Sequence, residues 1–242
     1  KSFSYHTHSK VVNSVLNVLL FICLSNICIA QNTKLPVSGL DYIDPTIGNV
    51  GQLLEPTRPT VQLPNQLIRF TPQRKDFLDD QISTFPFTIV SHRQGQVFSL
   101  KPSIGALTDK SWMAKMTFDH ALEINRPWYY STYLVDDEVK VEFTAGKKTG
   151  FYRFSFPNVK SKAILLGVYN GGKSSFNFIS ATEISGMETY HEDIKVFMYG
   201  VFSVAGTPGV LIKNKLLQER IVDGESVKAY ICFPESTREV EF

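Results

Sequence analysis

The sequence predicts an all-β protein, a large two-sheet antiparallel β-sandwich of the supersandwich kind. From Phe85 to the end, short runs of β-branched and aromatic residues recur at roughly ten-residue spacing, without a helical period. Turn-forming residues such as Asn170-Gly171-Gly172 and Gly206-Thr207-Pro208 separate these runs. Short strands joined by tight turns favour two packed sheets over a helical or mixed architecture.

The composition is that of an ordinary folded protein. The chain has 242 residues, of which 43% are hydrophobic and 20% are charged, and this excludes a disordered chain. Its net charge is +2, and Lys1 and Lys10 carry the only charges among residues 1–30, so residues 31–242 sum to 2 − 2 = 0. A neutral chain has no general attraction to nucleic acid, and we expect no nucleic-acid partner.

Residues 1–30 are predicted to be a signal peptide that forms a helix. Lys10 precedes an apolar stretch, and Cys28-Ile29-Ala30 places small residues at the −3 and −1 positions of a cut after Ala30. The alternative is a buried or membrane helix, but asparagines interrupt the run, which is short for a membrane span. We therefore expect secretion, to the periplasm or outer membrane of a Gram-negative bacterium, with no membrane span after cleavage.

Residues 31–84 are predicted to be a tether and a proline-rich segment that packs on the sandwich. Between Asp41 and Pro72 the prolines fix φ and remove amide donors, so we expect an ordered, irregular loop. At most it holds short strands at Val61–Leu63 and Leu67–Phe70. A long stiffened loop is more often functional than idle.

Residues 85–242 are predicted to form the sandwich domain itself. Val139, Val141 and Phe143 alternate with charged residues, which indicates a strand with one wet face. Asp223-Gly224 is a hairpin-turn signal before the last strand. The twelve predicted strands are Phe87–Val90, Val97–Leu100, Trp112–Asp119, Tyr129–Val135, Val139–Ala145, Phe151–Phe156, Ala163–Val168, Ser175–Ala181, Glu183–Met187, Lys195–Phe202, Gly209–Lys213 and Ser226–Phe233.

Few residues suggest chemistry. Ser91-His92-Arg93 follows an apolar strand, where His92 and Arg93 can hydrogen-bond sugar hydroxyls or form a structural polar turn. Glu55 and Asp76 lie in the proline-rich region, where they can reach a cleft. Two pairs of acids are adjacent in the sequence, Asp79-Asp80 and Asp136-Asp137. On a strand the two side chains of each pair would point to opposite faces, so neither pair is arranged for catalysis. Both pairs are interpreted as turn residues.

An aromatic cluster and the one cysteine outside the predicted signal peptide complete the candidates. Trp128-Tyr129-Tyr130 and Tyr133 either stack on sugar rings or, the more common role, fill the sandwich core. Cys232 lies in an apolar run, where a packed thiol is expected rather than a nucleophile. The sequence has no nucleotide-binding loop and no metal-ligand spacing, so we expect no cofactor and no metal in this chain.

Three segments, Asp41–Asn49, Pro127–Pro157 and Ile184–Phe202, follow the motifs of one enzyme family in order. They resemble the N-terminal domain of glycoside hydrolase family 92, the exo-acting α-mannosidases. The first and the third are the shorter matches. Asp41-Tyr42-Ile43-Asp44-Pro45-Thr46-Ile47-Gly48-Asn49 resembles the family's opening Tyr-Val-(Asp/Asn)-Pro-Phe-Ile-Gly-Thr. Ile184-Ser185-Gly186, leading into Val196–Phe202, is similar to the family's Ile-Ser-Gly and the strand that follows it.

The most specific resemblance lies in the middle of the chain, where order and spacing both hold. Pro127-Trp128-Tyr129-Tyr130-Ser131-Thr132-Tyr133-Leu134 is similar to Pro-Gly-Tyr-Tyr-Ser-Val-Tyr-Leu of the family. Val141-Glu142-Phe143-Thr144-Ala145 and Gly150-Phe151-Tyr152-Arg153-Phe154-Ser155-Phe156-Pro157 resemble its Val-Glu-Leu-Thr-Ala and Gly-Phe-His-Arg-Tyr-Thr-Phe-Pro. The histidine-rich stretch that follows the family's opening motif is replaced here by Val50–Pro59, which indicates a divergent branch.

The resemblance implies that this sandwich partners a C-terminal (α/α)6 barrel that is absent from the chain. That barrel would hold the catalytic acid, the catalytic base and calcium, and the whole protein would hydrolyse a mannose-containing glycan with inversion. We expect the sandwich to lend substrate contacts to it, and the candidates are Asn49, Glu55, Arg74, Asp76, His92 and Arg93. Two alternatives stay open, a non-catalytic carbohydrate-binding module and a purely structural sandwich.

Overall fold

The computed structural model describes residues 38–50, 58–76, 78–90, 95–191 and 193–242. The chain divides into two compact units, Lys1–Tyr42 and Ile43–Phe242. In the first, the described part is the short 3-10 helix η1 (Gly39–Tyr42). The predicted signal peptide lies outside the described residues. No helix in the described part of the chain is long and apolar enough to cross a membrane.

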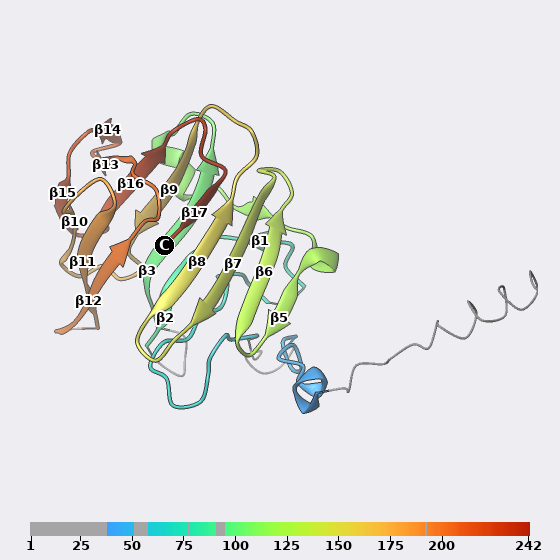
Figure 1. The fold of residues 1–242 in the computed structure, drawn as a ribbon. Helices are drawn as coiled ribbons and strands as arrows, with labels where there is room; N and C mark the ends of the chain where they lie inside the picture. The colour runs from blue at the N-terminus through green and yellow to red at the C-terminus, as the bar shows by residue number, and fades with distance from the viewer. Residues whose placement is uncertain (1–37, 51–57, 77, 91–94, 192) are drawn as a thin grey trace, which may run out of the picture. The chain divides into compact units, whose positions relative to one another are not determined.

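The second unit is built almost entirely of antiparallel strands, which confirms the predicted all-β sandwich (Figure 1). Its largest sheet has six strands in the order β14 (Lys215–Leu217), β13 (Thr207–Ile212), β16 (Lys228–Phe233), β9 (Lys162–Gly167), β3 (Gln96–Ile104) and β2 (Phe85–Ile89). A five-stranded sheet has the order β17 (Glu239–Glu241), β8 (Gly150–Ser155), β7 (Val139–Ala145), β6 (Tyr129–Leu134) and β5 (Ile124–Arg126).

A four-stranded sheet completes the sandwich, in the order β12 (Ile194–Val201), β11 (Glu183–Tyr190), β10 (Ser174–Phe178) and β15 (Ile221–Gly224). Beside these sheets lie the pair β1 (Gln81–Ile82) and β4 (Met116–Thr117), and the 3-10 helices η2 (Asp109–Trp112) and η3 (His120–Leu122).

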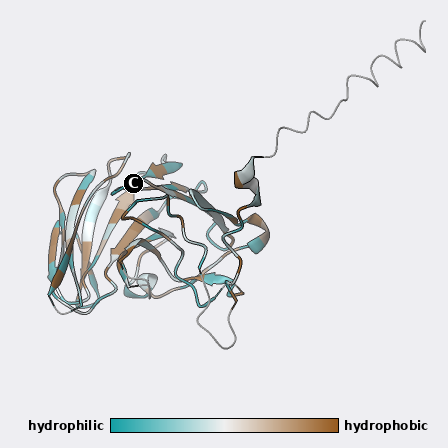
Figure 2. Cartoon of the chain, turned by 90° about the horizontal axis from the view of Figure 1, so that it is seen from below, coloured by the Kyte–Doolittle hydropathy of each residue, from teal (hydrophilic) through white to brown (hydrophobic). Residues whose placement is uncertain are grey.

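Both smaller sheets pack against the six-stranded sheet through aromatic contacts. The rings of Phe85 on β2 and Phe143 on β7 have centroids 6.3 Å apart, and those of Phe98 on β3 and Phe176 on β10 are 5.9 Å apart. All four rings belong to one hydrophobic cluster. Hydrophobic and hydrophilic residues interleave along the strands, as expected when one face of a sheet is buried (Figure 2).

A buried carboxylate joins the four-stranded sheet to the six-stranded sheet. Glu188 of β11 accepts hydrogen bonds from the backbone N–H groups of Phe98 (2.5 Å), Tyr169 (2.8 Å) and Asn170 (2.8 Å). Phe98 has φ 48°, a conformation that non-glycine residues rarely adopt. Burial raises the pKa of Glu188, against the lowering effect of these hydrogen bonds. The Glu188 carboxylate therefore fixes the backbone of β3 at Phe98, where φ is positive, against strand β11.

The central strand β9 is covered on both faces. Every residue of β9 is buried, with Ile164 and Leu166 in the main cluster and Ala163 and Leu165 in a second cluster. Trp112 packs on the second cluster and its indole Nε1–H donates to the Leu166 carbonyl at 2.9 Å. Trp112–Asp119 is thus not the strand that was predicted, because Trp112 ends η2 and only Met116–Thr117 is extended.

Two further details differ from the sequence prediction. Asp223-Gly224 does not turn a hairpin, since β15 pairs with β10 whereas β16 pairs with β13 and β9. The chain crosses from one sheet to another at this point. In the proline-rich segment, Val61 and Phe70 form one isolated bridge rather than two strands, because that region has few free amide donors.

Candidate functional site

The proline-rich segment is anchored to the sandwich by a buried ion pair. The guanidinium of Arg74 lies 3.0 Å from the carboxylate of Glu123, which directly precedes β5, and their side chains are 3% and 1% exposed. The same guanidinium stacks over the ring of Phe118 at 5.1 Å from its centroid. A second arginine, Arg58, donates to the Arg74 carbonyl at 2.6 Å.

Tyr130 of β6 completes the shell of Glu123. Its hydroxyl donates to Glu123 Oε1 at 2.7 Å. Complete burial raises the pKa of Tyr130 well above its usual value, and the neighbouring Glu123 carboxylate adds to this effect. The phenol therefore stays protonated and remains a donor. With Arg74 and Tyr130 on its oxygens, Glu123 is a structural anion and has no free oxygen facing solvent to act as a catalytic acid or base.

His120 lies at the rim of this cluster. Its Nδ1 is 3.7 Å from Glu123 Oε2, and its ring packs on Phe118 with centroids 4.6 Å apart. Asp119, its neighbour in the sequence, caps η3 by accepting from the Ala121 N–H at 2.8 Å. The rim is thus held by a helix cap and by an aromatic contact.

The loop that carries Asn49 is ordered by a local carboxylate. Asp44 accepts hydrogen bonds from the N–H (2.8 Å) and hydroxyl (2.6 Å) of Thr46, and the hydroxyl bond is the main cause of the lowered pKa of Asp44. The Asn49 N–H then donates to the Thr46 carbonyl at 3.1 Å. Gly48 has φ 80°, which a residue without a side chain adopts at low cost. These contacts turn the Asn49 side chain into the protein, where the residue is 2% exposed.

Asp76 lies in a turn near the end of the proline-rich segment. Its Oδ1 accepts from the Leu78 N–H at 2.9 Å, and its carbonyl accepts from the Asp79 N–H at 3.3 Å. Asp79 in turn accepts from the Lys75 and Gln81 N–H groups at 3.0 and 3.2 Å. Asp76 is half-buried, so part of its carboxylate reaches solvent.

Three of the six predicted contact residues meet at one place. Asn49, Arg74 and Asp76 line a single small cavity of about 10 Å³ together with Arg58 and Thr71. Such a volume holds about one water molecule and excludes a sugar ring. The other three candidates, Glu55, His92 and Arg93, lie outside the described residues. The cavity that these described residues line therefore has no room for a sugar, and whether the six candidates touch a sugar stays a prediction.

The sequence did not predict the residues that anchor the proline-rich segment to the sandwich. Glu123 stands between Leu122 and Ile124, and only this single acid in an apolar context marked it as buried. Tyr130 was predicted inside an aromatic strand, and the structure places it in the core at 0% exposure. Trp128 and Tyr133 are only partly buried. The pairing of Arg74 with Glu123 joins residues 49 positions apart, which no local pattern reveals.

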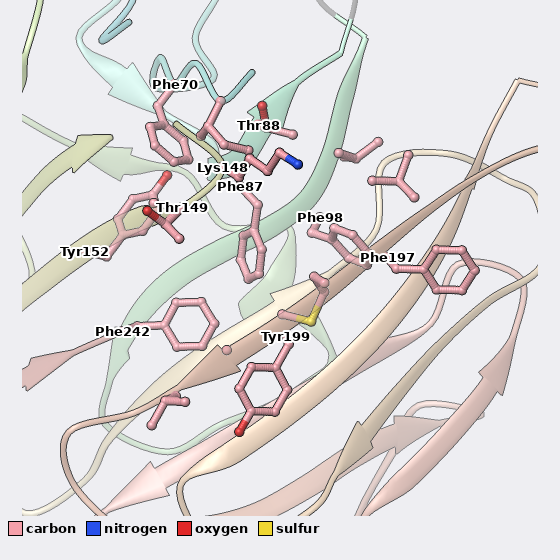
Figure 3. Close-up of a pocket in the computed structure, with 17 residues that line it drawn as sticks. Phe70, Phe87, Thr88, Phe98, Lys148, Thr149, Tyr152, Phe197, Tyr199 and Phe242 are labelled. Carbon is pink, nitrogen blue, oxygen red and sulfur yellow. The ribbon is translucent and has the colours of Figure 1, made fainter. Parts of the chain in front are cut away.

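A larger hollow lies on another part of the sandwich. This apolar groove of about 370 Å³ runs between β8 and β12, with β2 and β3 behind it (Figure 3). Its lining residues are Ile68, Phe70, Phe87, Thr88, Val97, Phe98, Lys148, Thr149, Gly150, Tyr152, Val196, Phe197, Met198, Tyr199, Gly200, Val201 and Phe242. The lining contains one charged side chain, Lys148, and no carboxylate or histidine, so the groove offers little chemistry for catalysis.

Metal ligands are not gathered in the described part of the chain. Among those residues no group of three or more histidines, cysteines or carboxylates lies together. Calcium in proteins takes six to eight oxygen ligands, several of them carboxylates. The described residues of the sandwich do not offer such a set.

The family follows from a direct comparison. The model of the glycosyl hydrolase family 92 N-terminal domain matches residues 42–242. The chain belongs to this family. The match confirms the resemblance and makes the sandwich a family 92 N-terminal domain, whose name implies a further domain in the full protein. No curated protein matches the chain significantly.

Solved structures show the same fold. The inverting mannosidase BT2199 of Bacteroides thetaiotaomicron aligns with TM-score 0.75 and 20% identity, over 86% of this chain and 31% of its own. The α-mannosidase BT3965 of the same organism, in complex with mannoimidazole, aligns with TM-score 0.72 and 20% identity, over 84% of this chain and 31% of its own. The family 92 N-terminal domain described here thus spans about a third of the length of these enzymes.

Proposed function

We propose that this family 92 N-terminal domain is the supporting half of a secreted glycoside hydrolase that resembles exo-acting, calcium-dependent, inverting α-mannosidases. The observation that carries the proposal is the family match over residues 42–242. In this role the sandwich braces a catalytic (α/α)6 barrel and presents its proline-rich loops to the substrate pocket. The substrate class is a mannose-containing glycan.

The residues of the sandwich suit a supporting role better than a catalytic one. Inverting hydrolysis needs a free acid and a free base roughly 6.5–9.5 Å apart, with room for water and sugar between them. In the loop cluster Glu123 is neutralised by Arg74, and the adjoining cavity of about 10 Å³ admits no sugar. We therefore assign the catalytic carboxylates and the calcium to the barrel.

The anchored loop is the part of the sandwich that we expect to meet the substrate. Its half-buried Asp76 is the described candidate whose carboxylate reaches solvent, and Asn49, Glu55, Arg74, His92 and Arg93 are the further candidates. The buried pair between Arg74 and Glu123 would hold the loop in one position, because a charge pair taken out of water is costly to break. A rigid support of this kind limits the entropy lost on substrate binding.

Substitution of the two described candidates in the full-length enzyme tests this role. We expect Asn49→Ala and Asp76→Ala each to lower kcat/KM for α-mannosides about tenfold or more, with the larger part in KM. Asp136→Ala, in an exposed turn between β6 and β7, is the control and should leave kcat/KM unchanged. Unchanged kcat/KM in both loop variants would remove the loop from the substrate site.

Secretion is part of the same proposal. The leader at residues 1–30 would be removed after Ala30, and the mature chain would reach the periplasm or the outer membrane of a Gram-negative bacterium. Expression in such a host, followed by amino-terminal sequencing of the exported protein, should give a chain that begins at Gln31. Retention of residues 1–30 on a cytoplasmic product would contradict it.

A further inference from the structure

The last strand of the described chain lies between two sheets. β17 pairs with β8 in antiparallel register, and Phe242 continues that pairing by exchanging two hydrogen bonds with Tyr152, at 2.8 and 2.9 Å. On the opposite edge, the Ser203 N–H donates to the Glu241 carbonyl at 2.9 Å, and the Glu241 N–H donates to the Ser203 hydroxyl at 2.8 Å. Ser203 is the second residue after β12, so β17 connects the five-stranded and four-stranded sheets.

Beyond Phe242 the edges of β8 and β12 continue, and the apolar groove lies between them. β8 and β12 run in the same direction, and β17 runs opposite to both (Figure 1). Extending β17 in its own direction leads along the first residues of β8 and the last residues of β12. These are the segments that line the groove, and the Phe242 ring lies at its end (Figure 3).

The backbone of both edges is oriented to receive a strand. In β8 the residues that pair with β17 alternate, so after Phe154 and Tyr152 the next amide facing the groove is that of Gly150. On β12 the Phe202 N–H is directed to β11, where it donates to Thr182, and alternation directs the Val201 and Tyr199 amides outward. β12 ends its sheet among the described strands. An open edge with free N–H and C=O groups is a template for strand addition.

We propose that the apolar groove is the seat of an extended strand formed by the polypeptide that directly follows Phe242 in the full-length protein. The inference rests on the proposed function in one respect, that a second domain follows the sandwich. The relatives of known structure are about three times as long as this chain, which covers 31% of their length. The direction of β17 leads that continuing polypeptide into the groove rather than into solvent.

The groove also sets the side-chain pattern of the added strand. Val240 is fully buried and the Phe242 ring packs on Phe87 and Phe202, with centroids 5.3 and 4.5 Å away. Because strand side chains alternate, the second and fourth residues after Phe242 face the apolar lining. The first and third face outward, beside the exposed side chains of Val201 and Tyr199. The strand would fuse the two sheets into one and seal the groove.

Adding a strand to the existing chain tests the inference without glycosidase activity. The 242-residue chain is compared with the same chain extended by Thr-Val-Thr-Val-Lys after Phe242. The matched control carries Thr-Pro-Thr-Pro-Lys, in which proline removes the two amides that would bond to β8. Amide hydrogen exchange is followed at Gly150, Tyr199 and Val201, and thermal unfolding is measured in parallel.

The first extension should slow exchange at these three amides at least tenfold and raise Tm by about 3 °C or more, and the proline extension should do neither. Equal exchange in both extended chains would overturn the proposal. If the unextended chain already protects these amides and sediments as a dimer, the occupant is a second copy. Protection by added α-mannobiose would instead make the groove a sugar site. Both outcomes reject the strand, and none depends on whether the full-length protein is a mannosidase.

Discussion

Lys101, in the middle of β3, is a lysine whose side chain is buried in the sandwich. The residue is 4% exposed, and its ammonium donates to the Ala114 carbonyl. Burial lowers its pKa from 10.5 to about 8, which nearby Asp137 only partly offsets. The folded state therefore disfavours the charged form. Below pH about 8 this cost is fully present, and it is relieved as the pH rises from about 8 towards 10.5.

We expect Lys101→Met to be more stable than the wild type at pH 7. The shift corresponds to about 3 kcal/mol at most, and loss of the bond to Ala114 reduces the net gain to about 1–2 kcal/mol. Urea unfolding at several pH values should show this difference narrowing between pH 8 and 10.5. Lys160→Met, at an exposed position, should show no such trend. A difference that stays constant with pH would mean that Lys101 is not held at a cost.

The Arg74–Glu123 pair predicts strong coupling between two substitutions. Each of Arg74→Met and Glu123→Gln leaves a buried partner without its counter-charge, and each should cost about 3–5 kcal/mol of unfolding free energy. The double variant should cost much less than the sum, because no unpaired charge is left. A double-mutant cycle by urea unfolding measures the coupling, and additive costs would show that the pair is not a unit.

The same residues show what the sequence reveals at this scale. Asn49, Arg74 and Asp76 were predicted as substrate contacts, which stays a prediction. The structure places all three around one cavity, because they share a stiff proline-rich segment. The partners Glu123 and Tyr130 were not predicted, since contacts between distant strands leave no local pattern. A buried acid flanked by apolar residues was the one signal available.

At the scale of single elements, Gly150 is fixed by the ring packed against it. A Cβ at this position would lie 2.2 Å from Phe70 Cζ, and Phe70 is fully buried among Phe143 and Tyr152. We expect Gly150→Ala to destabilise the fold by about 1–3 kcal/mol through overpacking at the start of β8.

Two further variants check that explanation. Gly171→Ala should be neutral, because a Cβ there meets no atom within 4 Å. Combining Gly150→Ala with Phe70→Leu should recover part of the loss, since the shorter side chain vacates the contested space. Urea titration measures the unfolding free energy of the wild type, of Gly150→Ala, of Gly171→Ala and of the double variant. If the double variant recovers none of the lost stability, the steric cause is contradicted.

Element prediction succeeded where the alternation was long and failed where it was short. β7 was predicted with its bounds because its alternating burial runs over seven residues. β14 and β17 have three residues each, too few to show a period, and both were missed. The crossing between β15 and β16 was read as a hairpin because Asp223-Gly224 carries a turn signal that does not reveal which sheet each strand joins.

At the scale of the whole molecule, the sandwich has a core of its own and surfaces that imply a partner. The three sheets share one hydrophobic cluster, which explains how the fold class was readable from pattern alone. Phe197 and Tyr199 on β12 are nevertheless 73% and 62% exposed. Aromatic rings on an open edge beside an apolar groove are typical of a surface that another segment covers. The sequence pattern predicted the strand but not its exposed edge.

The proposed division between a supporting sandwich and a catalytic barrel predicts that the sandwich alone is inactive. The purified 242-residue chain should hydrolyse α-mannosides no faster than the blank without protein, because its buried carboxylate Glu123 is paired with Arg74 and the adjoining cavity admits no sugar. Release of 4-nitrophenol from its α-mannoside, measured with and without calcium, checks this. The full-length protein, which we propose to be an α-mannosidase, is the comparison under the same conditions. Turnover that co-elutes with the folded chain in size-exclusion chromatography would place the catalytic groups in the sandwich itself, and would contradict the division of labour between a supporting domain and a catalytic barrel.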